Sequence, residues 1–223
     1  MISVAIDGPA GAGKSSLARA AAKELGFLYA DTGALYRTIA LYLLRAGVDV
    51  DAVSDWEEML KGLKVSLGFA DGEQHVYLNG EDVSGLIRTP EVSMMASVSS
   101  AKPPVRAHLL ELQRQLAREN DVLMDGRDIG TVVLPDATVK IFLTASAEER
   151  AKRRYKELTQ KGQTVSYEEV YKDMVQRDYQ DSHRAVAPLK PAADSVTVDT
   201  SGISLEDSLA LLLKTIRERL QEA

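Results

Sequence analysis

A run of eight residues near the start of the chain, residues 8–15, constrains the fold more than any other stretch. It reads Gly-Pro-Ala-Gly-Ala-Gly-Lys-Ser and fits the pattern G-x-x-x-x-G-K-[ST]. An apolar run precedes it at residues 2–7, and an amphipathic helical stretch follows at residues 14–25. In that context the glycines let backbone N–H groups face phosphate oxygens, and the helix N-terminus adds partial positive charge. The sequence therefore predicts a nucleoside triphosphate site between a strand and a helix.

The side chains of this loop have separate expected roles. Lys14 is long enough to reach the β- and γ-phosphates, and Ser15 or Ser16 supplies a hydroxyl to Mg²⁺. Asp125, which follows a later apolar run, is expected to hold the same Mg²⁺ through a water molecule. The triphosphate-binding residues predicted from the loop are Gly8, Pro9, Ala10, Gly11, Ala12, Gly13, Lys14, Ser15 and Ser16.

The rest of the chain alternates short apolar runs with helical stretches. Five buried strands separated by helices indicate an α/β fold, a parallel sheet covered by helices on both faces. The strands are expected at residues 2–7, 27–31, 122–125, 139–145 and 196–199. The helices are expected at residues 14–25, 34–45, 105–120, 147–161, 167–179 and 205–220.

One segment departs from this alternation. Between residues 64 and 83 the apolar residues recur at every second position, and the dipeptides Asp71-Gly72 and Asn79-Gly80 stand between the runs. Such dipeptides favour the tight turns of antiparallel hairpins. We therefore expect one domain over residues 1–223, with an inserted antiparallel lobe at residues 62–90.

Composition limits the class of partner. The formal net charge is -6, whereas proteins that bind nucleic acids neutralise phosphates with a basic face, so a nucleic-acid partner is not expected. The chain has no cysteine, which removes disulfides and thiol chemistry from consideration. Its first residues indicate a strand and not a signal peptide, and no apolar run is long enough for a membrane span. The expectation is a cytoplasmic monomer that binds small molecules.

Arginines gather in three places that suit an anionic acceptor. Residues 31–37 open a helix, with Thr32 expected to cap it and Arg37 one turn further on. Residues 124–130 follow the third strand, at the edge of the sheet where open α/β folds bind ligands. Residues 177–184 end a helix in alternating charge. Because a phosphate dianion is bound best by several planar donors, these clusters predict a second phosphate site.

Four motifs, in this order, resemble those of the bacterial cytidylate kinases, a family of nucleoside monophosphate kinases. They are GPAGAGKSS at residues 8–16, DTGALYR at 31–37, DGRDIGTVVLPDA at 125–137 and RDYQDSHRAVAPLKPA at 177–192. The likeness extends through the hairpin and its GEDVSGLIRTPEVS continuation at residues 80–93. It implies transfer of the γ-phosphoryl group of ATP-Mg²⁺ to CMP or dCMP by a five-stranded core with a short lid at residues 148–166.

The resemblance also implies a role for each matching residue. Arg150, Arg153 and Arg154 would belong to the lid and, being three and four residues apart on one helix face, would clamp the polyphosphate together. The remaining roles are Thr32, Arg37, Arg127 and Arg184 at the acceptor phosphate; Tyr36, Arg177 and Asp181 at the ribose; Ser97, Arg106 and Asp128 at the cytosine; and Lys14, Arg127, Arg153 and Arg154 at the transferred phosphoryl group.

Two alternatives stay open at the level of sequence. One is a kinase of the same architecture with another acceptor, such as UMP, AMP or shikimate. The other is a regulatory module that binds ATP and a partner protein, against which the three arginine clusters argue.

Overall fold

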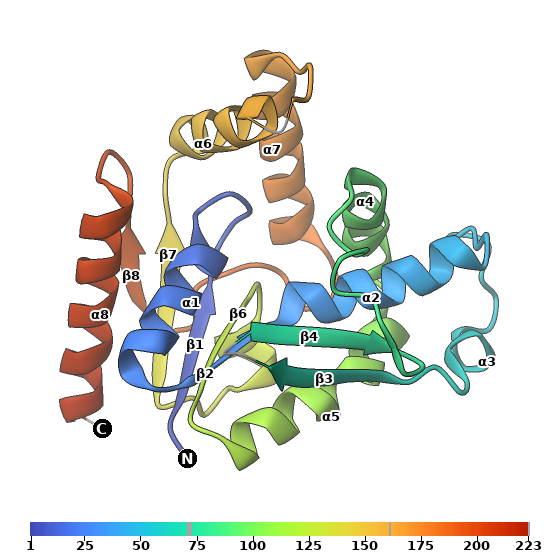
Figure 1. The fold of residues 1–223 in the computed structure, drawn as a ribbon, viewed down its shortest axis with the longest axis horizontal. Coiled ribbons are helices and arrows are strands. Elements are labelled where there is room, and N and C mark those ends of the chain that lie inside the picture. The colour runs from blue at the N-terminus through green and yellow to red at the C-terminus, as the bar shows by residue number, and fades with distance from the viewer. Residues whose placement is uncertain (71–72, 161, 223) are drawn as a thin grey trace. The chain divides into compact units, whose positions relative to one another are not determined.

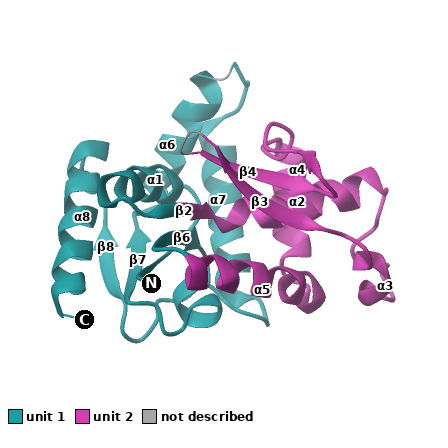
Figure 2. Ribbon diagram, turned by 60° about the horizontal axis from the view of Figure 1, so that its bottom comes forward, with its two compact units in different colours: residues 1–28, 120–223 teal, residues 29–119 magenta. Residues whose placement is uncertain are grey.

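The computed structural model describes residues 1–70, 73–160 and 162–222. The chain forms two compact units, one made of residues 1–28 and 120–223 and the other of residues 29–119 (Figure 2). Residues 1–28 and 120–223 are unit 1, and residues 29–119 are unit 2. The chain passes from unit 1 to unit 2 within the strand β2 (Leu28–Asp31).

A five-stranded sheet with the order β2-β6-β1-β7-β8 confirms the predicted fold class (Figure 1). The strand β1 pairs in parallel with β6 on one side and with β7 on the other, and β8 pairs in parallel with β7. The remaining elements of unit 1 are β1 (Ser3–Asp7), α1 (Lys14–Leu25), β6 (Val122–Gly126), a π-helical turn (Ile129–Val133), β7 (Val139–Thr144), α6 (Ala147–Gln160), α7 (Tyr167–His183), β8 (Val196–Asp199) and α8 (Leu205–Glu222).

The central strands are apolar on both faces, as expected for strands covered by helices on each side. Val4, Ala5 and Ile6 of β1 are almost fully buried, and so are Leu123 and Met124 of β6. The helix α1 packs on this sheet and against α8, and α6 packs against α7. Because β1 and β6 are parallel neighbours, their C-terminal ends lie side by side at one edge of the sheet.

Unit 2 holds a smaller antiparallel sheet with the order β3-β4-β5. The second predicted turn is present, with positive φ at Asn79 (51°) and Gly80 (89°). The first predicted turn, at Asp71 and Gly72, lies outside the described residues. The elements are α2 (Thr32–Arg45), α3 (Trp56–Leu60), β3 (Val65–Ala70), β4 (Glu73–Leu78), β5 (Glu81–Asp82), α4 (Pro90–Ser99) and α5 (Pro103–Glu119).

One hydrophobic cluster holds unit 2 together. It joins Leu35 and Ile39 of α2 to Val76 and Leu78 of β4 and to Val83 beyond the hairpin, all nearly fully buried. The segment at residues 62–90, which the sequence indicates as an inserted lobe, thus shares its core with α2.

The structure adds helices that the sequence patterns did not predict. These are α3 and α4, which begin with capping side chains: Asp55 accepts from the N–H of Glu58, and Thr89 from that of Val92. The helix α7 extends four residues beyond its predicted end at Tyr179. Lys161, the predicted end of α6, lies outside the described residues. None of the helices described is long and apolar enough to cross a membrane.

Candidate active site

The loop between β1 and α1 has the shape that a phosphate cradle requires. A Cβ atom on Gly8 would stand 1.9 Å from the carbonyl oxygen of Leu143 in β7, so this position has no room for a side chain. Gly13 precedes α1 in the left-handed conformation, with φ of 82°, which favours glycine. These two constraints place the loop directly before the N-terminus of α1, where partial positive charge favours an anion.

Lys14 is held in this loop. Its side chain is almost fully buried, and its Nζ donates to the carbonyl oxygen of Pro9 at 2.7 Å. Burial, and then the positive charge of Arg127, lower the pKa of Lys14, while the carboxylates of Asp125 and Asp7 oppose that shift. A polyanion bound here would favour the charged form of Lys14 and would be attracted to it.

An oxygen pair lies beside the loop. The Ser15 hydroxyl donates to Oδ2 of Asp125 at 2.9 Å, and Asp125 is 4% exposed at the end of β6. A hydroxyl next to a carboxylate fits a hard cation such as Mg²⁺, which prefers oxygen ligands. Ser16 instead lines the cavity described next. The pair therefore favours Ser15 over Ser16 as the hydroxyl that meets the metal.

A cavity of about 450 Å³ adjoins the phosphate loop in unit 1. Its walls combine loop glycines, two lid arginines and apolar residues next to α8. The lining residues are Gly11, Gly13, Ser16, Leu17, Arg153, Arg154, Glu157, Ile203, Leu205 and Ser208. This is a volume into which a nucleotide bound to the loop can extend.

The end of β6 and the end of α7 are joined by two acid–arginine pairs. Arg127 Nε donates to Oδ2 of Asp181 at 2.9 Å, and Arg184 Nη2 donates to Oδ1 of Asp128 at 3.5 Å. Burial raises the pKa of Asp181, but the charge and hydrogen bond of Arg127, together with the charges of Arg177 and Arg184, outweigh it and lower the pKa. Five predicted acceptor residues of unit 1 thus lie together.

The three arginines of the predicted lid differ in their contacts. Arg150 is 5% exposed and binds Asp178 through two hydrogen bonds of 3.0 and 2.6 Å. It also donates to the carbonyl oxygens of Ala10 and Ala145. Because these bonds occupy its guanidinium, Arg150 anchors α7 to the phosphate loop. Arg153 and Arg154 instead line the cavity beside the phosphate loop.

This difference predicts a stability effect for Arg150→Met. Removing one partner of a buried ion pair is costly, and with Asp178 a quarter exposed we expect a loss of about 2–3 kcal/mol in the free energy of unfolding. The matched control is Arg154→Met, whose bridge to Glu157 is largely exposed and should cost less than about 1 kcal/mol. Urea unfolding of both variants measures the difference, and equal losses would contradict the anchoring role.

In unit 2, two arginine side chains surround Asp31. The Asp31 carboxylate accepts from the N–H of Ala34 at 2.9 Å, from Arg37 Nη2 at 2.9 Å and from Arg88 Nη2 at 3.3 Å. Asp31 is therefore the cap of α2, and the prediction that Thr32 caps it is wrong: Thr32 is the first residue of the helix. Arg88 was missed because a single arginine between two predicted elements carries no local signal.

The other predicted residues of unit 2 lie on α2, α4 and α5. The Arg106 guanidinium stands over the Tyr36 ring at 5.3 Å from its centre, a cation–π geometry. Arg106 is 8% exposed and donates to the carbonyl oxygen of Ser100 at 3.2 Å. Ser97 is half-buried on α4, and its carbonyl oxygen accepts from the Ser100 hydroxyl. Arg106 is thus fixed by a ring and a carbonyl.

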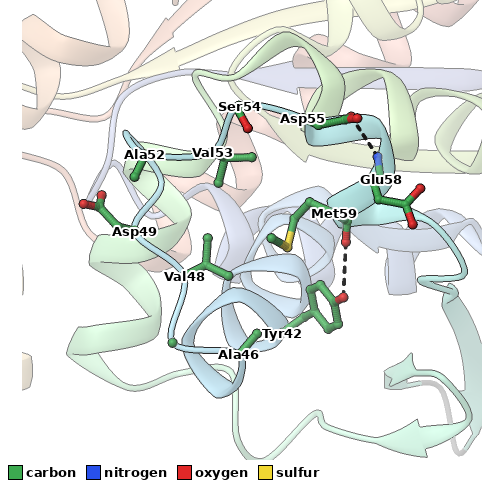
Figure 3. A pocket seen from close by; sticks show the side chains of 11 residues that line it. Tyr42, Ala46, Val48, Asp49, Ala52, Val53, Ser54, Asp55, Glu58 and Met59 are labelled. Atoms are coloured by element: carbon green, nitrogen blue, oxygen red, sulfur yellow. Dashed lines mark hydrogen bonds between the residues drawn. The ribbon is translucent and has the colours of Figure 1, made fainter.

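A second hollow, of about 570 Å³, lies at the C-terminal end of α2 (Figure 3). None of the predicted site residues lines it. Two of its polar side chains serve local structure: the Tyr42 hydroxyl donates to the carbonyl oxygen of Met59, and Asp55 caps α3 (Figure 3). The hollow has no evident part in phosphoryl transfer.

Asp7 is a further residue that sequence patterns did not single out. It is the last residue of β1, 4% exposed, and its two carboxylate oxygens accept from the N–H groups of Ile129 at 2.7 Å and Gly130 at 2.8 Å. Burial raises its pKa to about 6, although both backbone bonds lower it. Asp7 is thus bonded to the turn that follows Arg127 and Asp128.

Comparison with known proteins gives a consistent result. A family model described as cytidylate kinase matches residues 4–218. The cytidylate kinase of Geobacter sp. (strain M21) is 49% identical over 220 residues, covering 98% of this chain and 94% of that protein. That of Carboxydothermus hydrogenoformans is 48% identical over 213 residues, covering 96% of each. A solved gluconokinase from Sinorhizobium meliloti 1021 covers 99% of this chain and 94% of its own, with a TM-score of 0.50 and 14% identity, which shows the fold alone.

Proposed function

The chain belongs to the cytidylate kinase family, and we propose which of its residues carry out the family's reaction. That reaction transfers the γ-phosphoryl group of ATP to CMP or dCMP and yields ADP with CDP or dCDP. The single observation that carries the assignment is the hydrogen bond from Ser15 to Asp125. It joins the phosphate loop to the segment that holds Arg127 and Asp128, so the groups for donor and acceptor share one edge of the sheet.

The donor site is built on residues 8–16. Backbone N–H groups of the loop and the N-terminus of α1 receive the phosphates, and Lys14 contacts the β- and γ-phosphates. The cavity beside the loop receives the nucleoside, with Arg153 and Arg154 on its wall. Ser15 and Asp125 would hold Mg²⁺, the latter through water, and the ion would neutralise charge on the phosphate oxygens.

The acceptor residues are assigned from the sequence motifs. We assign Thr32, Arg37, Arg127 and Arg184 to the CMP phosphate, and we add Arg88 to this proposal because it shares Asp31 with Arg37. Planar guanidinium groups suit a phosphate dianion because they donate two parallel bonds. The remaining assignments are Tyr36, Arg177 and Asp181 at the ribose, and Ser97, Arg106 and Asp128 at the cytosine.

The chemistry needs no nucleophilic side chain. The attacking group is an oxygen of the CMP phosphate, whose second pKa is about 6, so it is already ionised at neutral pH. A general base is therefore unnecessary, and the protein contributes positioning and stabilisation of charge on the transferred group. Lys14, Arg127, Arg153 and Arg154 are the side chains assigned to that charge.

Arg184→Met tests the acceptor assignment. Losing a charge-assisted hydrogen bond costs roughly 1.5–3 kcal/mol, so we expect the KM for CMP to rise about 10–100-fold while the KM for ATP changes little. Arg217→Met, an exposed arginine on α8, is the control. Steady-state kinetics with each substrate varied in turn measures both constants, and a rise confined to ATP would overturn the assignment.

The wider biological setting follows from the same assignment. We propose a monomer that acts in the cytoplasm on small-molecule nucleotides without a nucleic-acid partner. The net charge of -6 supports the last point. Size-exclusion chromatography with light scattering tests the monomer, which an elution mass of twice 24.3 kDa would contradict.

A further inference from the structure

Asp128 stands where a side chain normally caps a helical turn, but its own side chain does not do so. It precedes the π-helical turn Ile129–Val133, and no hydrogen bond from that turn reaches its carboxylate. An aspartate at such a position ordinarily accepts from a backbone N–H in the first turn. Here the Asp128 carboxylate accepts from Arg184 instead.

The residue that caps the turn is Asp7, which lies 122 positions before Ile129 in the chain. Asp7 and Gly126 are register partners in the parallel pairing of β1 with β6, so the Asp7 carboxylate lies level with the start of the segment that β6 leads into. Its two oxygens take the N–H groups of Ile129 and Gly130, one each. An ionised carboxylate can accept both bonds at once, whereas an amide has only one oxygen to offer.

We propose that Asp7 is a positioning residue that caps the Ile129–Val133 turn in place of Asp128 and thereby keeps the Asp128 carboxylate directed at the acceptor nucleotide. The inference rests on the acceptor role proposed above for Asp128. Buried backbone N–H groups are almost always paired, so a turn without the Asp7 carboxylate takes the nearest alternative acceptor. That acceptor is the adjacent Asp128, whose side chain then turns away from the substrate.

The test is Asp7→Asn, which preserves the size of the side chain and replaces one acceptor oxygen by an N–H₂ donor. We expect kcat/KM for CMP to fall by roughly 10–100-fold, since a misplacement of a bound substrate by about 1 Å can cost up to about 100-fold even when the substituted residue is distant from the reacting atoms. The KM for ATP should stay within about twofold, and the preference for CMP over UMP should shrink. If CMP efficiency is unchanged, or if ATP and CMP are affected equally, the positioning role is overturned.

Asp121→Asn is the matched control. The Asp121 carboxylate accepts from the backbone N–H of Ile2 at 2.6 Å, so it makes the same kind of bond between the same two strands at their opposite ends. Both variants replace a carboxylate that supports the sheet by an amide, but the single bond to Asp121 can pass to the amide oxygen, whereas Asp7→Asn loses one of two accepted bonds. Only Asp7→Asn should therefore alter the CMP to UMP ratio. A similar change of the ratio in both would overturn the proposal. If Asp7→Asn does not fold, Asp7→Ser, with a smaller side chain and one accepting hydroxyl, takes its place.

A double-mutant cycle separates this inference from the function on which it rests. If Asp7 acts through Asp128, the double variant Asp7→Asn with Asp128→Asn should have a kcat/KM for CMP no lower than that of the less active single variant. Losses that multiply would overturn the inference. If Asp128→Asn alone leaves CMP kinetics intact, the proposed base contact is wrong. If Asp128→Asn alone impairs CMP use and Asp7→Asn does not, only the inference fails.

Discussion

Lys14→Met is expected to reduce kcat by about 10²–10³ while the protein stays folded. One charged donor at a transferred group has about this value in catalysis. Methionine has a similar length, so it fills the buried space that Lys14 occupies and loses only the ammonium group with its bond to Pro9. Steady-state assays with saturating ATP and CMP measure kcat, and single-turnover assays with enzyme in excess over ATP measure the phosphoryl-transfer step itself.

Lys23→Met is the control for this variant, because Lys23 lies on the same helix but is exposed. Its turnover should be within about twofold of the parent, as is usual for surface substitutions. Circular dichroism establishes that both variants are folded. Near-normal phosphoryl transfer by Lys14→Met would contradict the assignment of the loop as the donor site.

Asp128→Asn is expected to reduce the preference of the enzyme for CMP over UMP. Cytosine presents an amino donor at C4 and an unprotonated N3, which in the proposed assignment would pair with the carboxylate of Asp128 and with a donor of Arg106. Uracil presents an oxygen at C4 and an N–H at N3. The Asp128 carboxylate would then face another acceptor, and the Arg106 guanidinium would face another donor. Sites of this kind reject the wrong base strongly, and we expect CMP to be preferred over UMP by roughly 10²-fold or more. The asparagine amide can serve the uracil oxygen, so the variant should narrow that gap.

The competing explanation is that Asp128 only orients an arginine. The structure gives this explanation a specific form, because Asp128 pairs with Arg184 whereas Arg127 pairs with Asp181. In that case both pyrimidines would lose efficiency equally. Asp136→Asn, an exposed aspartate further along the same motif, is the control. An unchanged ratio of CMP to UMP efficiency in Asp128→Asn would remove the base-reading role and leave the kinase assignment intact.

The parts of this fold that follow from local patterns could be predicted from the sequence. The helix α1 begins and ends where predicted, because the glycine loop fixes its start and Gly26, in the left-handed conformation, its end. The buried strands of the sheet were evident as apolar runs. The Asn79-Gly80 turn was predictable because few other dipeptides accept positive φ at both positions.

The parts that depend on contacts distant in sequence could not be predicted. Asp31 and Thr32 are both good capping residues, and only the backbone conformation decides that Asp31 caps α2. Arg150 shares a helix face with the other lid arginines, but its pairing with Asp178 depends on how α6 packs against α7. The contact of Asp7 with the turn after β6 likewise depends on strand pairing. Spacing along a helix shows which side chains share a face but not what that face contacts.

A coupled assay of ADP release, with each of several acceptors at equal concentration, decides whether the chain is a cytidylate kinase in its activity. We expect release that depends on CMP or dCMP, is at least about 10²-fold less efficient with UMP, and is weak with AMP and shikimate. Omitting the acceptor should reduce release to the background of ATP hydrolysis. Equal release with and without acceptor, or a clear preference for UMP, AMP or shikimate, would show that phosphorylation of CMP is not its activity.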